Sequence, residues 1–423
     1  MTAEIAILNK YAVVLAADSA VTVGGGTKIF DTVNKIFEIS DSIGLMIFNN
    51  PDFVGFPLEV LAKKFRRSYR DKKYSTVKEC KEEFVKFLIS ENNLPDDLLF
   101  ENSLGILEAI LSDLMKDLSR DLSIIISKNI KNVQTSKFNG ALHKILEADK
   151  KLVTSLYDKI DGMSKFDFSK KLEDGLIKSA ELIFKPVVLT DTSKNKIKSY
   201  VKSYIKSQRM SPRSTGLVFS GYGEEEIFPS LVHVELDGIF DGNLRQVVIN
   251  EVDIDRRKDR GILLGFAQDD MVQSFVNGTD PLFRAFSEEL LFEAMQSSAL
   301  LVAKGVYGDD TKANALMSAL AANFDSLAED FRTEIKQFVA SKFTQDVQSM
   351  VMSMPRQEMA NLAEALIDIT SMKRRVTRQQ ESVGGDVDVA VISKSEGLVW
   401  VKRKHYFPAE INSRFFGRQG GRK

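Results

Sequence analysis

The chain has 423 residues and a mass of 47.4 kDa, enough for two or three ordinary domains or for one domain with large insertions. Its composition of 43% hydrophobic and 28% charged residues is typical of globular proteins and excludes a largely disordered or collagen-like chain. The 58 basic and 59 acidic residues give a net charge of −1, so charge offers no basis for binding nucleic acid or a membrane surface.

Metal, redox and membrane functions also lack their sequence signals. Cys80 is the only cysteine, and the three histidines (His143, His233 and His405) lie far apart, so we expect neither a metal nor an organic cofactor. No apolar run reaches the roughly 18–20 residues of a membrane span, and the first residues do not resemble a signal peptide. There is no GxxxxGK[ST] loop, no GxGxxG after a strand and no GxSxG elbow. Because neither a membrane span nor a signal peptide is evident, we expect a cytoplasmic protein, and we expect it to be bacterial.

The N-terminal part predicts a meander of four short strands. Residues 3–8 form a short apolar run. Residues 11–17 (YAVVLAA) form a second run that is apolar on both faces, as in a strand that is covered on both sides. Residues 35–39 and 43–48 predict the third and fourth strands.

Helical patterns begin at Pro51. Residues 70–208 contain few prolines and repeat apolar residues at spacings of three and four, which predicts a large helical insertion. Near its end, Lys198, Lys202 and Lys206 lie on one helical face. A solvated face explains these lysines, and a docking surface for an acidic partner is the alternative.

Strand runs return in the second half of the chain, and a second helical block follows them. An order of strands, helices, strands, helices and a closing hairpin indicates an α+β domain. A four-layer αββα sandwich would cover two antiparallel sheets with the two helical blocks. Strands are predicted at 215–222, 228–236, 245–251 and 261–266, helices over 268–372, and the hairpin over 387–402.

This order divides the chain into a core and an insertion. We predict a discontinuous core of residues 1–69 and 209–408, interrupted by the helical insertion at 70–208. The basic, glycine-containing tail at 409–423 is expected to be disordered.

Thr2 is the candidate nucleophile. Methionine is normally removed before so small a residue, which would give Thr2 a free α-amine beside its own hydroxyl. An N-terminal threonine can attack with its own amine as the base, because the α-amine has a reference pKa of about 7.7–8.0. A neighbouring lysine cation would lower that pKa by charge repulsion.

Asp18 and Lys35 mark the ends of two predicted strands. Asp18 closes the apolar run VVLAA and Lys35 opens the third strand, so their side chains can meet beside the start of the first strand. A charge at the end of an apolar strand is expected to be paired. A structural ion pair at the rim of the sheet is the alternative to a catalytic role.

Several segments together resemble a proteasome β-type subunit and its bacterial relative HslV. They are the pair Thr2 and Asp18 with the segment VVLAADSAVT, residues 34–39 (NKIFEI) and the closing residues 384–392 (GGDVDVAVI). These families are N-terminal nucleophile (Ntn) hydrolases with the αββα fold, so the resemblance implies that fold and a threonine-type peptidase or amidase. Only the two ends of the chain carry the motifs, and the middle matches by element order.

The resemblance assigns catalytic roles to individual residues. Thr2 corresponds to the catalytic threonine and Asp18 to the aspartate that orients the lysine. Lys35 corresponds to the lysine that lowers the pKa of the amine, and Lys28 is a weaker candidate for that role.

The resemblance also implies contacts to substrate. Ser19 and Thr22 match residues of the substrate groove, where Thr22 would offer backbone contacts to a bound peptide. Asn49 lies near the position of the glycine whose backbone N–H stabilises the oxyanion.

The sequence departs from the family where the terminal amine is supported. An aspartate and a serine precede the Gly-Gly pair in the family, whereas Gln380 and Val383 stand at these positions here. Ser382, one place along, is a candidate substitute for that serine. Loss of such supporting residues can lower activity strongly.

The leading hypothesis is therefore a threonine-nucleophile hydrolase that cleaves a peptide or amide substrate. The family encloses its sites in rings, so the resemblance implies a homo-oligomer, with a ring as one form and a regulator or unfoldase as a candidate partner. One alternative is a catalytically weak or inactive homologue that serves as an assembly or recognition module. Another is a small-molecule amidase. No nucleic-acid or membrane partner is expected.

Overall fold

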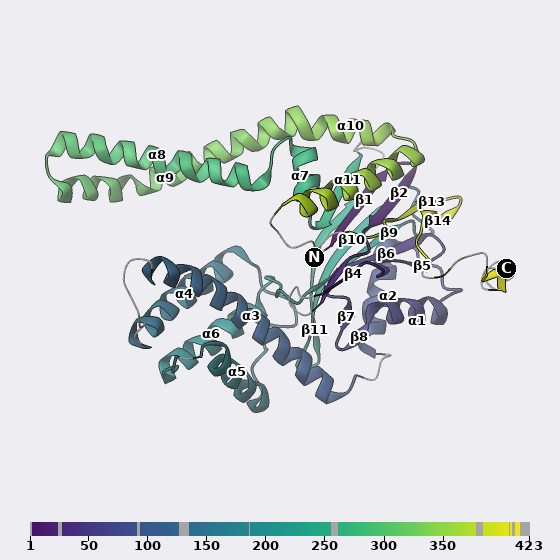
Figure 1. The fold of residues 1–423 in the computed structure, drawn as a ribbon, viewed down its shortest axis with the longest axis horizontal. Helices are drawn as coiled ribbons and strands as arrows, with labels where there is room; N and C mark the ends of the chain where they lie inside the picture. Colours follow the sequence, from purple (N-terminus) through teal and green to yellow (C-terminus); the bar gives the residue numbers. More distant parts are fainter. Residues whose placement is uncertain are drawn as a thin grey trace. The chain divides into compact units, whose positions relative to one another are not determined.

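The computed structural model describes residues 2–23, 28–90, 94–126, 135–185, 187–254, 261–377, 384–405, 407 and 411–414. The chain is a mixed α and β protein with antiparallel sheets (Figure 1). Its contacts divide it into a first unit, Met1–Val33 with Ile254–Lys423, and a second unit, Asn34–Asp253. Each unit contains one five-stranded sheet.

The sheet of the first unit is built from both ends of the chain. Its strand order is β12-β1-β2-β13-β14, and all neighbours are antiparallel. The two strands expected at the N-terminus are confirmed as β1 and β2, and all their residues are buried, which explains why neither run alternates with polar residues. The strands of this sheet are β1 Ala3–Asn9, β2 Ala12–Ala17, β12 Ile262–Ala267, β13 Asp388–Ser393 and β14 Gly397–Lys402.

Helices cover one face of this sheet. Ile5 and Ile7 of β1 belong to a buried cluster with Met359 and Ala363 of α11. No helix among the described residues is both long and apolar enough to cross a membrane. The helices of the first unit are α7 Asp270–Asn277, α8 Pro281–Tyr307, α9 Asp310–Val339, α10 Gln345–Ser353 and α11 Arg356–Val376, with a π-helical segment, Ala340–Thr344, between α9 and α10.

The second unit has a sheet of order β11-β10-β9-β6-β5, which α1 and α2 cover on one face. Aromatic rings join the layers, because the ring of Phe84 on α2 lies 5.1 Å from that of Phe65 on α1 and 5.5 Å from that of Phe219 on β9. The elements are β5 Ile36–Ser40, β6 Ile43–Asn49, the short pair β7 Asp52–Phe53 and β8 Phe56–Pro57, α1 Leu58–Ser68, α2 Val77–Ser90, β9 Thr215–Gly221, β10 Ser230–Phe240 and β11 Asn243–Asp253.

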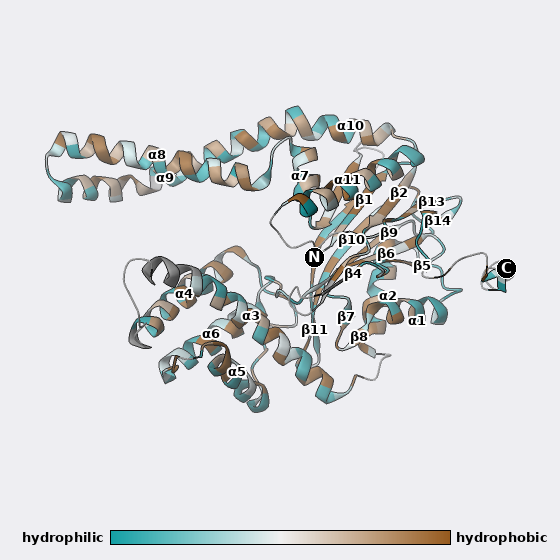
Figure 2. Cartoon of the chain, in the orientation of Figure 1, coloured by the Kyte–Doolittle hydropathy of each residue, from teal (hydrophilic) through white to brown (hydrophobic). Residues whose placement is uncertain are grey.

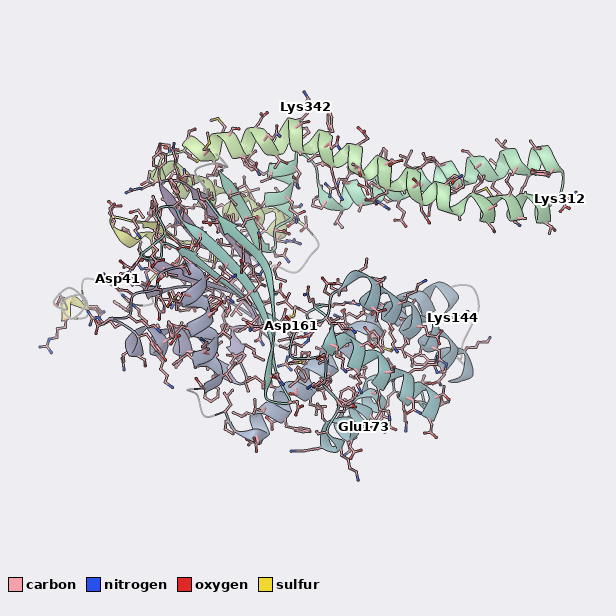
Figure 3. All side chains as sticks on the ribbon, turned by 180° about the vertical axis from the view of Figure 1, so that it is seen from behind. Asp41, Lys144, Asp161, Glu173, Lys312 and Lys342 are labelled. Carbon is pink, nitrogen blue, oxygen red and sulfur yellow. The ribbon has the colours of Figure 1, made fainter. Side chains whose placement is uncertain are left out.

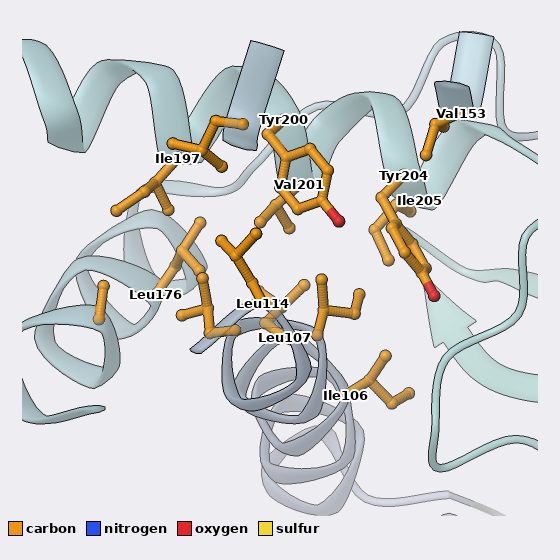
Figure 4. Packing of buried hydrophobic residues seen from close by; sticks show 14 of the residues in the cluster. Ile106, Leu107, Leu114, Val153, Leu176, Ile197, Tyr200, Val201, Tyr204 and Ile205 are labelled. Atoms are coloured by element: carbon orange, nitrogen blue, oxygen red, sulfur yellow. The ribbon is translucent and has the colours of Figure 1, made fainter. Parts of the chain in front are cut away.

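A separate helical cluster lies between α2 and β9, inside the range of the predicted insertion. Its core contains Leu107, Leu114, Leu176, Ile197 and Val201, which meet between the helices (Figure 4). The boundaries at 70 and 208 stay a prediction. The helices are α3 Asp96–Ile126, α4 Thr135–Leu156, α5 Lys170–Ile183 and α6 Asp191–Lys206.

The lysines on one face of α6 have partners within this cluster. Lys198 lies 2.8 Å from a Glu173 carboxylate oxygen, and Lys202 lies 2.7 Å from Asp167. Lys206 donates to a backbone carbonyl at 2.8 Å. Local ion pairs on a solvated face therefore account for these lysines better than a docking surface for an acidic partner.

The opposite face of each sheet also carries buried apolar residues. By strand alternation, Leu8, Val13 and Leu15 lie on that face in the first unit, and Met46 and Val218 lie on it in the second. All five side chains are buried. A four-layer αββα sandwich would stack these two faces, and that arrangement stays a prediction.

Candidate active site at the start of β1

Thr2 lies directly before β1 and is 4% exposed. Its hydroxyl donates to a carboxylate oxygen of Glu4 at 3.0 Å. Its carbonyl oxygen accepts the backbone N–H of Gln268, also at 3.0 Å, which ties Thr2 to the end of β12. Thr2 is therefore held by a side-chain and a main-chain hydrogen bond.

Glu4 is the residue of this site that the sequence motifs miss. It is 1% exposed, although it stands in a strand whose other residues are apolar up to Leu8. Residues two apart share a face of a strand, so Glu4 and Thr2 point to the same side, opposite to Ile5. The sequence did contain a signal for Glu4, namely a single carboxylate in an otherwise apolar run. Burying a charged side chain is costly, so such a residue is expected to have a specific partner.

Asp18 fixes the backbone on which Thr2 stands. Its carboxylate accepts the backbone N–H of Ala3 at 3.1 Å, of Gly384 at 3.0 Å and of Ala20 at 3.3 Å. The carboxylate is 1% exposed, and these three donors offset the cost of burying it. Asp18 thus joins the start of β1, the end of β2 and the approach to β13.

The glycine pair before β13 packs tightly against the segment after Asp18. Gly385 has a φ of 75°, and a Cβ atom there would lie 2.8 Å from the carbonyl oxygen of Asp31, so a larger residue does not fit. Ser19 is fully buried, and its hydroxyl donates to the carbonyl of Asp386. The predicted contact of Ser19 with substrate stays a prediction.

Two predicted site residues belong to the second unit. Lys35 precedes β5 and is 5% exposed, and its carbonyl oxygen accepts the backbone N–H of Ile47 at 2.9 Å. Asn49 ends β6 with a φ of 64°, in the left-handed region that asparagine tolerates well. The meeting of Lys35 with Asp18 and the role of Asn49 at an oxyanion stay predictions.

The remaining predicted site residues cannot be described in full. Thr22 lies on β3 (Val21–Val23) and Lys28 on β4 (Lys28–Phe30), and these two short strands pair with each other, but their side chains lie outside the described residues. Gln380, Ser382 and Val383 also lie outside the described part of the chain.

An ion pair between Asp388 and Lys404 lies on the same sheet face as Thr2 and Glu4. Glu4 pairs with Ala17 on β2, and Ala17 pairs with Asp388 on β13, so the two carboxylates lie on either side of a small residue. Lys404 donates to Asp388 through its ammonium group and through its backbone N–H at 2.9 Å. The side chains of Lys404 and Asp388 are 8% and 3% exposed. We call Glu4, Asp388 and Lys404 the charged row.

The arrangement can activate a nucleophile. A hydroxyl that donates to a carboxylate at hydrogen-bond distance has a base in place to receive its proton. Among the described residues, no group of three or more His, Cys, Asp or Glu side chains could hold a metal ion. The chemistry that the residues themselves support is proton transfer from the Thr2 hydroxyl.

Comparison with known proteins gives no family for this chain. No family model matches it, and no curated protein matches it. Among solved structures, a Gly-1 mutant of Anbu from Hyphomicrobium sp. strain MC1 aligns over 100% of this chain and 97% of that chain, at 9% identity and a TM-score of 0.28. A TM-score this low does not establish a shared fold.

The assignment to the proteasome β-type and HslV family is therefore wrong. The segments that suggested it have local physical causes. VVLAA is apolar because β2 is buried on both faces, and a glycine is required at position 385, where the backbone approaches Asp31. Features of this kind arise in unrelated sheets, so the function of this chain has to be argued from its own site.

Proposed function

We propose that this chain is a threonine-nucleophile hydrolase that cleaves peptide or amide bonds. The observation that carries the proposal is the buried hydrogen bond from the Thr2 hydroxyl to the Glu4 carboxylate, at 3.0 Å. Asp18 supports it, because its hydrogen bond to the Ala3 N–H holds the backbone next to the nucleophile.

The reaction proceeds through an ester of Thr2. Glu4 takes the hydroxyl proton as the Thr2 oxygen bonds to the substrate carbonyl carbon, and backbone N–H groups stabilise the oxyanion. The C–N bond then breaks, and the proton passes from Glu4 to the leaving amine. Water that Glu4 deprotonates attacks the ester, which releases the acid and restores Thr2.

The proposed reaction also requires that the substrate reach Thr2. Thr2 is 4% exposed in the full chain, and removal of Met1 is the change that we propose opens it. Removal also creates a free α-amine, which serves as a second base through a bridging water. The role of Lys35 as the cation that lowers the pKa of this amine stays a prediction of the sequence.

The first test is the intact mass of the protein, with and without a threonine-directed β-lactone. We expect loss of Met1 and a single covalent adduct, and no adduct on Thr2→Ala. The matched control is Thr377→Ala, which removes an exposed threonine at the end of α11 and should label like the wild type. An adduct that persists on Thr2→Ala would contradict the proposal.

The second test separates the two bases. We expect Glu4→Gln to lower kcat by roughly 10²–10⁴-fold with little change in KM, because the amide cannot accept the hydroxyl proton. Glu4→Asp keeps a carboxylate and should retain part of the activity. A Glu4→Gln variant with the kcat of the wild type would assign the base role to the α-amine instead.

A further inference from the structure

The charged row places two carboxylates on one face of the sheet in the first unit. Glu4 and Asp388 are both cross-strand partners of Ala17, so their side chains point to the same side of the sheet. Adjacent strands lie about 4.8 Å apart, so about 10 Å separates the two backbones. The alanine between them adds only a methyl group, and no bulky side chain of β2 therefore separates the two carboxylates.

Water screens these two charges poorly. Both residues are buried, and the neighbouring strands β1 and β2 carry mostly hydrophobic residues (Figure 2). Lys312 and Lys342, which are labelled in Figure 3, are exposed, and that is the ordinary position of a charged side chain. Buried charges interact over longer distances than exposed ones, so each carboxylate of the row opposes the ionisation of the other.

Lys404 supplies the positive charge of the row. Its ammonium group donates to one oxygen of Asp388, and its backbone N–H donates to the other oxygen at 2.9 Å. Both groups of this ion pair are buried, with side-chain exposures of 8% and 3%. Lys404 therefore neutralises Asp388 at the place where its negative charge would act on Glu4.

The other neighbours of Glu4 bring no further cation to this face. Its cross-strand partners are Phe266 of β12 and Ala17 of β2, and neither is charged. Asp18, the remaining buried carboxylate near Thr2, accepts three backbone N–H groups. Helices α10 and α11 contribute to the apolar cluster on the opposite face. Within the described part of the first unit, Asp388 and Lys404 are thus the charged pair that shares the face of Glu4.

We infer that Lys404 is a positioning residue of the proposed hydrolase and keeps Glu4 ionised by neutralising Asp388. The inference rests on the proposed function, in which Glu4 receives the hydroxyl proton of Thr2. Without the ammonium group, Asp388 would remain a bare anion, because the backbone N–H of residue 404 still favours its charged form. Glu4 would then take up a proton from water, and Thr2 would lose its base.

The first test is the rate at which a threonine-directed β-lactone labels Thr2, measured as a function of pH. We expect the acid limb of the profile to move up by about one pH unit in Lys404→Met and down by a similar amount in Asp388→Asn. The double variant should return close to the wild type. Methionine keeps the length of the lysine stem, and asparagine keeps an acceptor for the backbone N–H, so each substitution mainly removes a charge.

The matched control is Lys402→Met, two residues away. Lys402 forms its ion pair with Glu364 of α11, on the opposite face of the sheet, so its loss should leave the profile unchanged. Equal acid limbs in the wild type and Lys404→Met would overturn the inference. Shifts of the same sign in Lys404→Met and Asp388→Asn would also overturn it, because a general loss of packing does not depend on the sign of the charge removed.

The second test does not depend on catalysis. Carbon-13 NMR of protein labelled at the glutamate carboxyl groups follows the titration of Glu4, whose signal is the one absent from Glu4→Gln. We expect its midpoint to rise in Lys404→Met and to fall in Asp388→Asn, by about one pH unit each. These shifts without any β-lactone adduct would confirm that Lys404 keeps Glu4 ionised and would contradict the proposed function. An adduct on Thr2 with unchanged midpoints would overturn the inference and leave the proposed function in place.

Discussion

His233 illustrates how burial sets the charge of a single side chain. It lies on β10, is 8% exposed, and its ring packs 5.3 Å from that of Phe48. Burial lowers the pKa of His233 from 6.5 to about 4. Its Nε2 lies 4.0 Å from a carboxylate oxygen of Glu235, whose own pKa is raised by burial. His233 is therefore neutral in the folded chain at neutral pH.

The lowered pKa predicts a loss of stability in acid. The stabilisation from neutral His233 is fully present above pH 6.5 and is lost as the pH falls towards about 4, because only the unfolded chain takes up the proton readily. The full loss amounts to about 3 kcal/mol. We expect the urea midpoint of His233→Gln to depend less on pH over this range than that of the wild type, with Glu235 present in both. Parallel pH profiles for the two proteins would show that His233 is not the titrating group.

At this scale the sequence identified part of the candidate site. Thr2 and Asp18 could be singled out, because a hydroxyl beside the N-terminus and a charge at a strand end are local signals. Glu4 was not assigned because no motif includes it, although its partner Thr2 is only two residues away, and Lys404 was not assigned because its partner Asp388 lies on another strand, β13. Asp18 itself is held by three backbone N–H groups that no residue pattern encodes.

The end of α6 depends on one buried arginine from β11. Arg245 is fully buried, and its guanidinium donates to the carbonyl of Ile205 at 2.9 Å and to that of Ser207 at 2.8 Å. It also forms an ion pair with Asp237 on β10. The last carbonyls of a helix have no partners within it, so Arg245 both caps α6 and ties the helical cluster to the sheet.

Removal of this cap should destabilise the second unit. We expect Arg245→Ala to lower the free energy of unfolding by about 3–5 kcal/mol, because Asp237 would remain buried without its cation. The comparison is Arg209→Ala, which breaks an ion pair with Asp149 whose side chains are 25% and 23% exposed, and it should cost less, about 1 kcal/mol. Urea unfolding of both variants measures the difference. Equal losses of unfolding free energy in the two variants would mean that burial does not determine how much the Arg245–Asp237 ion pair contributes to stability.

Elements with a clear apolar pattern were predictable from sequence. The strands expected at 35–39, 43–48 and 215–222 are confirmed as β5, β6 and β9, since their runs are apolar and bounded by turns. The pair β3–β4 was missed, because each strand has only three residues. β10 and β11 extend to eleven residues each, beyond the predicted ranges, because they pair with each other along nearly their full length.

At the scale of the molecule, the first unit depends on strands from the start of the chain. β1 and β2 are the second and third of its five strands, and Asn9 donates to the carbonyls of Val351 and Met354 at 2.9 Å each. The pairing of β2 with β13 joins residues that are remote in sequence. Element order could be predicted, but this pairing could not, because no local pattern specifies it.

This architecture predicts how the chain behaves when it is cut. We expect residues 254–423 alone to lack cooperative urea unfolding, because β12 and β13 lose their neighbours β1 and β2. Addition of a peptide of residues 2–33 should restore a cooperative transition, whereas the same peptide with Ile5 and Ile7 changed to Asp should not. Cooperative unfolding of the fragment by itself would show that the central strands are dispensable.

The position of β1 and β2 also governs the order of events during synthesis. At roughly 5–20 residues per second, the ribosome delivers β13 about 20–70 s after β2. The second unit is continuous in sequence and emerges completely within that interval. During that interval β1 and β2, which are largely apolar and buried in the folded chain, lack their neighbour β13. The β1–β2 hairpin of the nascent chain therefore lacks part of its sheet for most of translation, and unpaired apolar strands of this kind are prone to aggregation.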